Sequence, residues 1–233
     1  MRDSPQAPDP SRSRSVSRRT IRSTRSAPPA GRSTEEERMD ADDWDARYRA
    51  AERVWSAEPN RWVAREVGGL PPGRALDLAA GEGRNAAWLA SRGWQVDALD
   101  FSPVAVRRIT EAAGLHADAV HAEVADVTRH TPAEAAYDLV LISYLHLPRP
   151  EMDGVLASAC RAAAPGGTLL LVGHDVSNRE HGTGGPQDER LLSRVGQVRA
   201  AWEPYAEIVL AEVARRPVGD ATALDTVVRA VRR

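Results

Sequence analysis

The stretch from Ala75 to Asn85, ALDLAAGEGRN, constrains the fold of this 233-residue chain more than any other. A short apolar run that ends in closely spaced glycines and passes into helix-forming residues predicts a buried strand, a tight turn and a helix. Glycine in such a turn lets a ligand approach the backbone closely. A second apolar run ends in Asp100, followed by Phe101 and Ser102. Because neighbouring parallel strands end at one edge of a sheet, we expect Asp100 beside the glycine turn.

Strand and helix patterns alternate along the rest of the chain. Strand-like runs are predicted at 74–80, 95–100, 119–124, 137–145, 168–172, 206–213 and 223–231, and helical patterns at 84–91, 104–113, 151–163 and about 188–202. This alternation predicts an α/β fold, a doubly wound and mostly parallel sheet of seven strands with crossover helices. The last two runs are joined by too few residues for a parallel return, so the last strand is expected to be antiparallel.

The beginning of the chain differs in composition from the rest. Residues 1–34 carry eight Arg against two acidic residues, are rich in Ser and Pro and contain no aromatic side chain. Such a segment cannot form a core, so we expect a disordered extension over 1–38 and one domain over 39–233, with Met39 as an alternative start. Without residues 1–34 the chain has 23 basic and 31 acidic residues, a net charge of −8. That charge makes a nucleic-acid partner unlikely, because phosphate backbones favour basic surfaces.

A helix is expected before the first strand. Its expected cap is Ser33 or Thr34, and the residues that follow at helical spacing are Trp44, Tyr48, Ala51 and Trp55. Their aromatic rings form either an apolar stripe that anchors the helix or a lid over a cationic ligand. The Gly-rich segment 178–187 is either a mobile substrate gate or an ordinary connection.

The single cysteine and the short apolar runs indicate where the protein resides. Cys160 is the only cysteine, so no intramolecular disulfide is possible, and its place on the apolar stripe of the 151–163 helix predicts a core residue. No apolar run approaches the roughly 20 residues that a membrane helix needs. No basic segment leads into an apolar stretch of the kind a secretory signal requires. We therefore expect a cytoplasmic protein with no membrane partner.

The acidic residues near the glycine turn favour a cationic ligand. Residues 81–86, GEGRNA, also fit the Gly-x-Gly-x-x-Ala fingerprint of dinucleotide-binding enzymes. However, Asp77 in the strand and Glu82 in the turn would repel phosphates at the following helix N-terminus. They suit a sulfonium nucleotide with an amino-acid tail, with Asp77 near its ammonium group and Asp100 on its ribose. Asp126, at the end of the next strand, is expected on the adenine side.

With these motifs, residues from about Trp44 to Arg232 resemble the class I S-adenosylmethionine-dependent methyltransferases. The motifs that carry the resemblance are LDLAAGEG (76–83), the acid at Asp100, ADV (125–127), YDLV (137–140) and APGG (164–167). Ala79 stands where the family has its first glycine, and we expect cofactor binding to survive this change. The stretches GEGRN, WDARY (44–48) and GGPQD (184–188) resemble the branch that includes tellurite-resistance and thiopurine-type enzymes.

The resemblance implies a Rossmann-like methyltransferase fold. The implied activity is in-line transfer of a methyl group from S-adenosylmethionine to a small-molecule acceptor, with S-adenosylhomocysteine as the product. The cofactor-binding residues it implies are Asp77, Ala79, Gly81, Gly83, Asp100, Phe101, Ser102, Asp126, Val127 and Ser143.

The chemistry on the acceptor side carries no sequence signature. Candidate bases at the ends of the fourth and fifth strands are Ser143, Tyr144, His146, His174 and Asp175, of which Tyr144, His146 and His174 are retained as catalytic candidates. No metal is expected, because the spacing of the histidines and Asp175 fits no compact ligand pattern. The sequence leaves the acceptor and the oligomeric state open. Two alternatives remain: an NAD-type oxidoreductase and a non-catalytic S-adenosylmethionine-binding module.

Overall fold

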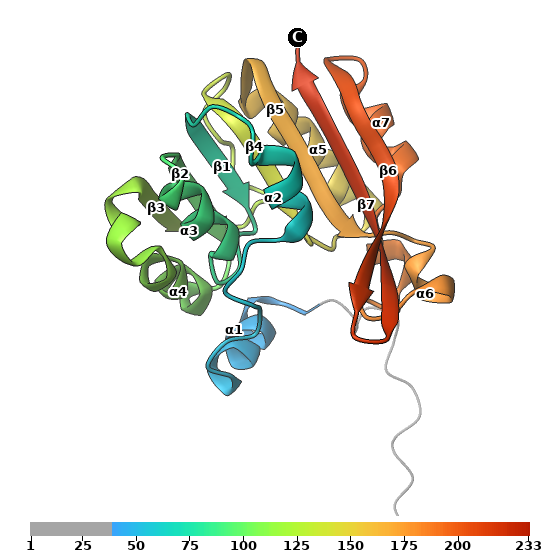
Figure 1. The fold of residues 1–233 in the computed structure, drawn as a ribbon, viewed down its shortest axis with the longest axis horizontal. Coiled ribbons are helices and arrows are strands. Elements are labelled where there is room, and N and C mark those ends of the chain that lie inside the picture. The colour runs from blue at the N-terminus through green and yellow to red at the C-terminus, as the bar shows by residue number, and fades with distance from the viewer. Residues whose placement is uncertain (1–38) are drawn as a thin grey trace, which may run out of the picture. The chain divides into compact units, whose positions relative to one another are not determined.

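Seven strands of the described chain form one sheet in the order β3-β2-β1-β4-β5-β7-β6 (Figure 1). The computed structural model describes residues 39–233, so the predicted extension over 1–38 and the expected cap at Ser33 or Thr34 lie outside it. All pairs are parallel except those of β7, which is antiparallel to β5 and β6. The predicted α/β fold class is confirmed. The strands are β1 Arg74–Leu78, β2 Gln95–Asp100, β3 Val120–Val124, β4 Tyr137–Ser143, β5 Ala163–His174, β6 Ala206–Val218 and β7 Ala221–Arg232.

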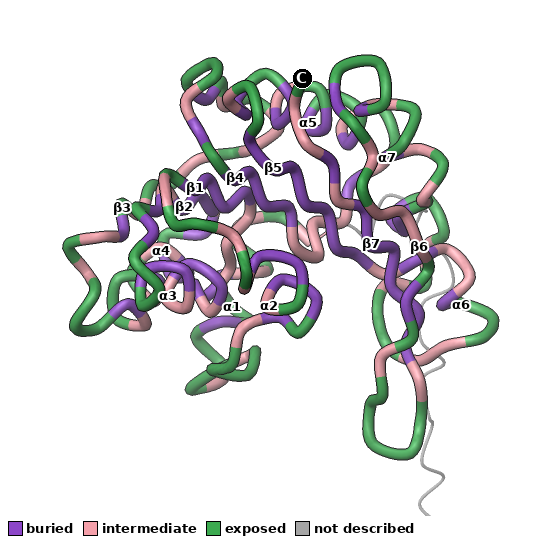
Figure 2. The backbone as a smooth tube through the Cα atoms, turned by 45° about the horizontal axis from the view of Figure 1, so that its top comes forward, coloured by how far each residue is buried: buried purple, intermediate pink, exposed green. Residues whose placement is uncertain are grey.

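Helices cover both faces of the sheet. One face packs against α2 (Arg61–Val67), α3 (Arg84–Ser91) and α4 (Pro103–Ala113), and the other against α5 (Arg149–Ala162) and α7 (Val195–Trp202). Each helix presents an apolar side to the sheet, which is how a doubly wound fold builds two cores. Figure 2 shows the central strands as a buried band, whereas the far end of the β6–β7 hairpin is exposed.

The core side of α5 follows the predicted stripe. Met152, Val155, Leu156, Ala159 and Cys160 are all buried, so Cys160 is a core residue as predicted. In the same core, the indole of a fully buried tryptophan on α7 hydrogen-bonds to a carbonyl of α5. The two helices thereby cover the β4–β5 side of the sheet as one layer.

The N-terminal part of the domain differs from the prediction. Helix α1 spans Ala41–Ala50 and begins at Asp40, whose side chain accepts a hydrogen bond from the Asp43 backbone while Asp43 caps it in return. Trp55 therefore lies beyond the helix rather than on it. Helix α2 was not predicted, because it has only seven residues; its cap is Asn60, whose side-chain oxygen accepts two backbone N–H bonds.

The C-terminal half also departs from the prediction at three places. The helix expected at about 188–202 is a short 3₁₀ turn, Glu189–Leu191, followed by α7. Strand β5 begins at Ala163, because that residue pairs with Tyr137 before an irregularity in the register. The β6–β7 hairpin is longer than expected and turns at only two residues, 219–220. Two further short elements are the 3₁₀ helix Gly114–Ala119 and α6, Asn178–His181.

In a sheet of this order, a ligand crevice is expected at the carboxyl ends of β1, β2 and β4. Strand β1 pairs with β2 on one side and with β4 on the other. The strands that follow β1 are therefore added first on one side of it and then, from β4 on, on its other side. In doubly wound sheets, ligands bind at the carboxyl ends of the strands at such a switch point. Among residues 39–233, no helix is both long enough and apolar enough to cross a membrane.

Candidate functional site

The glycine turn between β1 and α3 has an unusual backbone. Ala79, Gly81 and Gly83 have φ angles of +60°, +58° and +80°. Gly83 is required, because a Cβ there would lie 2.8 Å from the Cα of Ile109 on α4. Ala79 adopts a conformation that costs an L-residue about 1–2 kcal/mol. The turn is thus held in a strained shape at the mouth of the crevice.

Asp77, near the carboxyl end of β1, lacks any hydrogen-bond partner. Its side chain is fully buried, and neither carboxylate oxygen meets a donor. Burial raises the pKa of Asp77 to about 7, and the nearby charge of Asp100 adds to the effect. A buried carboxyl group without a donor or a cation is costly, so this group is suited to a ligand that brings positive charge.

Asp100, at the end of β2, has a different environment. Its Oδ2 accepts a hydrogen bond from the Gly81 backbone N–H (2.8 Å), and its Oδ1 accepts one from the Ser102 N–H (2.9 Å). Burial raises its pKa, while the two backbone donors act in the opposite direction. Each oxygen keeps a lone pair, so the carboxylate can still accept hydroxyl groups.

The remaining predicted cofactor residues lie at the same edge but differ in what their side chains do. Ser102 caps α4, because its hydroxyl accepts the Ala105 N–H (3.0 Å) and donates to Asp45 of α1. Ser143 ends β4 with a buried hydroxyl that has no partner. Phe101 is half-buried, Asp126 accepts two hydrogen bonds from Thr128, and Val127 packs against the α5-side core.

Glu82 holds the chain together rather than facing a ligand. Its Oε2 accepts the backbone N–H groups of Val54 and Trp55, both at 2.9 Å, and its Oε1 pairs with Arg108 of α4. The sequence interpretation, in which Glu82 adds free negative charge to the turn, is therefore corrected. Of the two acids, Asp77 alone remains without a protein partner.

Three aromatic side chains gather beside the turn. The ring centroids of Trp44 and Tyr48 are 5.5 Å apart, and those of Trp44 and Trp55 are 6.4 Å apart. Tyr48 is buried against α4, and its hydroxyl would lie 3.4 Å from a Cβ on Gly81. Trp55 is 37% exposed and reaches the same glycine. Tyr48 thus anchors α1, as in the stripe interpretation, whereas the lid interpretation stays a prediction for the partly exposed Trp55.

Three rings lie at the ends of β4 and β5. The ring of Tyr144 is 5.0 Å from that of His174 and 6.3 Å from that of His146, and the two imidazoles stack at 5.6 Å. Burial and the neighbouring His174 lower the pKa of His146 to about 3, and burial lowers the pKa of His174. Both rings are therefore neutral at pH 7. Tyr144 also has a positive φ of +57°.

Asp225 of β7 connects these rings, and the sequence analysis missed it. Its fully buried Oδ2 accepts hydrogen bonds from Trp62 Nε1 (2.8 Å), Tyr144 OH (3.0 Å) and Arg216 Nε (2.7 Å). The only sequence signal was an acidic residue inside an apolar strand, in the run ALDTVV. Buried carboxylates in strands are rare unless they are paired, which makes this position informative.

Arg84, the first residue of α3, was also missed. Burial lowers its pKa, and no carboxylate of residues 39–233 forms an ion pair with it. Its Nη1 donates a long hydrogen bond to the Ser56 hydroxyl (3.4 Å), and its guanidinium lies 5.9 Å from the Trp55 ring centroid. A half-buried guanidinium without an ion-pair partner beside the glycine turn can bind a carboxylate.

Two further polar residues that the sequence analysis considered differ in their surroundings. Asp175 accepts hydrogen bonds from Ser177 and Thr226, and His181 lies on the surface beside Glu180. Within the described part of the chain, no three His, Cys, Asp or Glu side chains are grouped as ligands for a metal ion.

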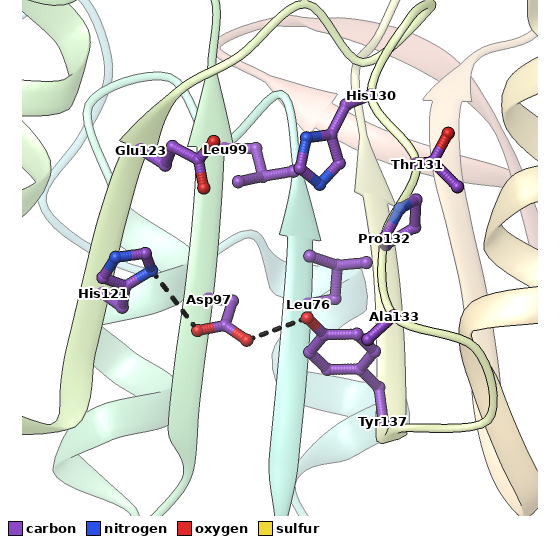
Figure 3. Close-up of a pocket in the computed structure, with 10 residues that line it drawn as sticks. All are labelled: Leu76, Asp97, Leu99, His121, Glu123, His130, Thr131, Pro132, Ala133 and Tyr137. Atoms are coloured by element: carbon purple, nitrogen blue, oxygen red, sulfur yellow. Dashed lines mark hydrogen bonds and ion pairs between the residues drawn. The ribbon is translucent and has the colours of Figure 1, made fainter.

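A second hollow lies away from this edge. It has a volume of about 300 Å³ and is bordered by β1, β2, β3 and the segment that precedes β4 (Figure 3). Its central acid, Asp97, already accepts the Tyr137 hydroxyl (2.9 Å) and pairs with Arg74 and His121. Because Asp97 is paired and no glycine turn borders the hollow, it lacks the features that mark the predicted crevice.

The chain matches known methyltransferases in sequence and in structure. The family model described as a methyltransferase domain matches residues 75–167. The demethylmenaquinone methyltransferase of Renibacterium salmoninarum is 31% identical over 184 residues, which cover 75% of this chain and 74% of that protein.

Two solved structures share the fold. The N-methyltransferase NodS from Bradyrhizobium japonicum WM9, in complex with S-adenosyl-L-homocysteine, superposes with a TM-score of 0.63 at 15% identity and covers 81% of this chain and 96% of its own. TehB from Haemophilus influenzae has a TM-score of 0.65 at 14% identity, and the match covers 83% of this chain and 67% of TehB. At such identities the likeness concerns the fold alone, so the tellurite-resistance branch stays a prediction. The similarity to the Renibacterium salmoninarum enzyme, together with the seven-stranded sheet and the acidic glycine turn, shows the family. The chain belongs to the class I S-adenosylmethionine-dependent methyltransferases.

Proposed function

We propose that this enzyme methylates a small molecule that binds at the carboxyl ends of β4 and β5. The relative from Renibacterium salmoninarum has a small molecule, demethylmenaquinone, in its name. The net charge of −8 over residues 35–233 supports an acceptor without a phosphate backbone. A cytoplasmic location, where the donor is made and the lone cysteine stays reduced, is part of this proposal.

The observation that carries the proposal is the unpartnered carboxyl group of Asp77. S-adenosylmethionine, when bound, supplies the methyl group and a positive charge. Asp77 would face its ammonium group, Asp100 its ribose hydroxyls and Arg84 its carboxylate. The backbone of residues 79–83 would line the ligand, Asp126 and Val127 would lie on the adenine side, and Trp55 would exclude water.

The acceptor would lie among the neutral rings beyond Ser143. Tyr144, His146 and His174 form a wall of rings that is uncharged at pH 7, with the Arg216 guanidinium 5.6 Å from the Tyr144 ring centroid. Such a surface suits a planar or weakly polar molecule better than a cation.

The two alternatives differ from this proposal in different ways, one in the ligand and the other in the reaction. A dinucleotide would bring a diphosphate to the turn, where ionised Asp77 would repel it. A non-catalytic module would bind the cofactor equally well, but would form no S-adenosylhomocysteine with any member of a broad panel of phenols, thiols and amines.

Calorimetry on the full chain tests the proposal. We expect S-adenosylhomocysteine to bind the wild type and to bind Asp77→Asn at least about tenfold more weakly, because a charge-assisted contact is lost. Asp118→Asn, an exposed position, is the matched control and should bind as the wild type does. Binding of NAD without binding of S-adenosylhomocysteine would overturn the proposal.

A further inference from the structure

We propose that His174 is the general base that takes a proton from the acceptor, and that Asp225 is the positioning residue that sets its tautomer. This inference rests on the proposed methyl transfer at the same site. It assigns separate roles to two residues on neighbouring strands, β5 and β7, which pair directly in the sheet register. Their side chains therefore share one face of the sheet.

The surroundings of His174 distinguish its two ring nitrogens. Nδ1 lies 3.5 Å from Asp225 Oδ1, is shielded from solvent and has no hydrogen-bond partner as placed. The side chain as a whole keeps 12% of its surface exposed, so the ring is not sealed from the crevice. Nδ1 is therefore the ring nitrogen on which the nearby carboxylate would favour a hydrogen, which leaves the lone pair on Nε2 for the acceptor.

The orientation of Asp225 is fixed by its other partners. Three donors, from Trp62, Tyr144 and Arg216, surround Oδ2, while Oδ1 faces His174 with only the longer contact from Arg216 Nη2 at 3.3 Å. The carboxylate cannot rotate without losing these bonds. Oδ1 is therefore held toward the imidazole.

The titratable groups around His174 come from β6, β7 and the segment that follows β4. Asp225 of β7 favours its protonation, whereas Arg216 of β6 opposes it; the neutral His146 and Tyr144, at and beyond the end of β4, complete the surroundings. Burial exceeds the effect of Asp225, and the pKa of His174 is lowered. The ring is neutral at pH 7 and can accept a proton there.

A glycine covers one face of the ring. A Cβ on Gly185 would lie 2.6–3.0 Å from three ring atoms of His174, and the φ of Gly185 is +78°. Asn178 holds this segment, because its side-chain nitrogen donates to the Gly184 carbonyl (2.8 Å) and its oxygen accepts the Leu224 N–H (2.7 Å). The segment is thus a fixed cover over the imidazole.

At this site the transfer of the methyl group is coupled to the transfer of a proton. The acceptor, an O–H, S–H or N–H compound, gives its proton to His174 Nε2 while its electron pair forms the bond to the methyl carbon and the broken sulfur–carbon pair stays on sulfur. The resulting imidazolium is stabilised by Asp225, and the proton later leaves to solvent.

Asp225→Asn is predicted to reverse the tautomer without changing the shape of the side chain. Three donors surround Oδ2, so the amide oxygen must occupy that position, and the amide NH₂ then faces His174 Nδ1. Nδ1 becomes an acceptor, and the ring proton moves to Nε2. The same substitution in a catalytic triad produces the wrong tautomer in this way.

Nitrogen NMR of the histidine rings tests this inference. The experiment uses the full chain, labelled with ¹⁵N-histidine and mixed with S-adenosylhomocysteine, with His174→Gln to assign the signals. At pH 7.5 we expect a protonated Nδ1 and an unprotonated Nε2 in the wild type and in Asp220→Asn, a matched change at the exposed hairpin turn. In Asp225→Asn we expect the reverse, an unprotonated Nδ1 and a protonated Nε2. Asp225→Glu should restore the wild-type pattern.

The wild-type spectrum decides the matter even if Asp225→Asn does not fold. A protonated Nε2 in the wild type, or an unchanged tautomer in folded Asp225→Asn, would overturn the assignment of base and positioning residue. Calorimetry separates this outcome from failure of the proposed function. If S-adenosylhomocysteine binds but the tautomer is wrong, only the inference about His174 and Asp225 fails.

Discussion

Two carboxylates at neighbouring strand ends show how environment divides similar residues between roles. Asp100 is held by two backbone N–H groups, whereas Asp77 is buried with no donor at all. Their mutual repulsion adds to the cost of burying Asp77. A protein that keeps such a group loses stability in the free state and gains a binding site for a cation.

The free protein should lose stability as the pH rises because of Asp77. Its pKa is about 7 in the folded protein and about 3.9 in an unfolded chain. Between these values the folded state holds a proton that the unfolded state has released, so the free energy of unfolding falls by about 1.4 kcal/mol per pH unit. Urea unfolding at pH 5 and pH 8 should show that Asp77→Asn gains stability relative to the wild type at the higher pH. A constant difference between the two proteins would contradict the buried, unpaired state.

Replacing Asp100 should weaken cofactor binding. Asp100→Ala removes the acceptor of the Gly81 and Ser102 N–H groups and the acceptor that we propose for the ribose hydroxyls, so the free energy of S-adenosylhomocysteine binding should weaken by about 1–3 kcal/mol. Calorimetry beside Asp118→Ala, an exposed control, measures the loss. Equal affinity in both variants would remove Asp100 from the site.

At the scale of elements, the crevice depends on contacts that join segments far apart in the chain. Glu82 and Arg108 hold the segment after α1 against the turn, since Arg108 Nη2 also donates to the Ala51 carbonyl (2.8 Å). Asn178 joins the Gly-rich segment to β7. Of the two interpretations of segment 178–187, these bonds favour a fixed connection over a mobile gate.

Glu82→Gln should loosen the segment that carries Trp55. The amide keeps one oxygen for the Val54 and Trp55 N–H groups but places an NH₂ against Arg108, so an ion pair is lost in a largely buried place. We expect the free energy of unfolding to fall by about 1–3 kcal/mol and S-adenosylhomocysteine to dissociate faster. Glu111→Gln on the exposed side of α4 is the control. Thermal unfolding and stopped-flow dissociation are the measurements, and identical behaviour of the two variants would refute the role of Glu82.

Gly185→Ala and Gly184→Ala separate backbone strain from contact with the imidazole. Both glycines have positive φ angles, +78° and +70°, so both variants should lose about 1 kcal/mol of stability. Only at Gly185 would the new methyl group meet the His174 ring, because nothing lies within 4 Å of a Cβ on Gly184. Gly185→Ala should therefore also shift the His174 ring signals, while S-adenosylhomocysteine affinity stays unchanged. Equal ring signals in both variants would argue against the cover.

Much of the sheet could be predicted from the sequence, whereas the acceptor side could not. The bounds of β2 and α3 match the prediction, because β2 ends at Asp100 and α3 begins directly after Gly83, each with a clear period. The seven residues of α2 give too short a pattern to detect. Asp225 and Arg216 were missed because their roles arise from pairing across β5, β6 and β7, which local patterns do not contain.

At the scale of the whole molecule, the sheet order determines where chemistry can occur. The switch between β1 and β4 brings the strand ends that carry Asp77, Asp100 and Ser143 to one edge, and the antiparallel β7 adds Asp225 from the opposite chain direction. The hollow of Figure 3 lies on the face of β1–β3 instead, and its acid is already paired. Of these two places, the carboxyl edge with the unpartnered Asp77 is the one that we propose for the cationic nucleotide.

A crystal structure of the full chain with S-adenosylhomocysteine tests this account most directly. The account predicts density at the carboxyl edge of the sheet, with the amino group in contact with Asp77, the ribose on Asp100 and the sulfur directed toward the rings of Tyr144 and His174. Density for the nucleoside in the hollow beside Asp97, or an amino group turned away from Asp77, would contradict it.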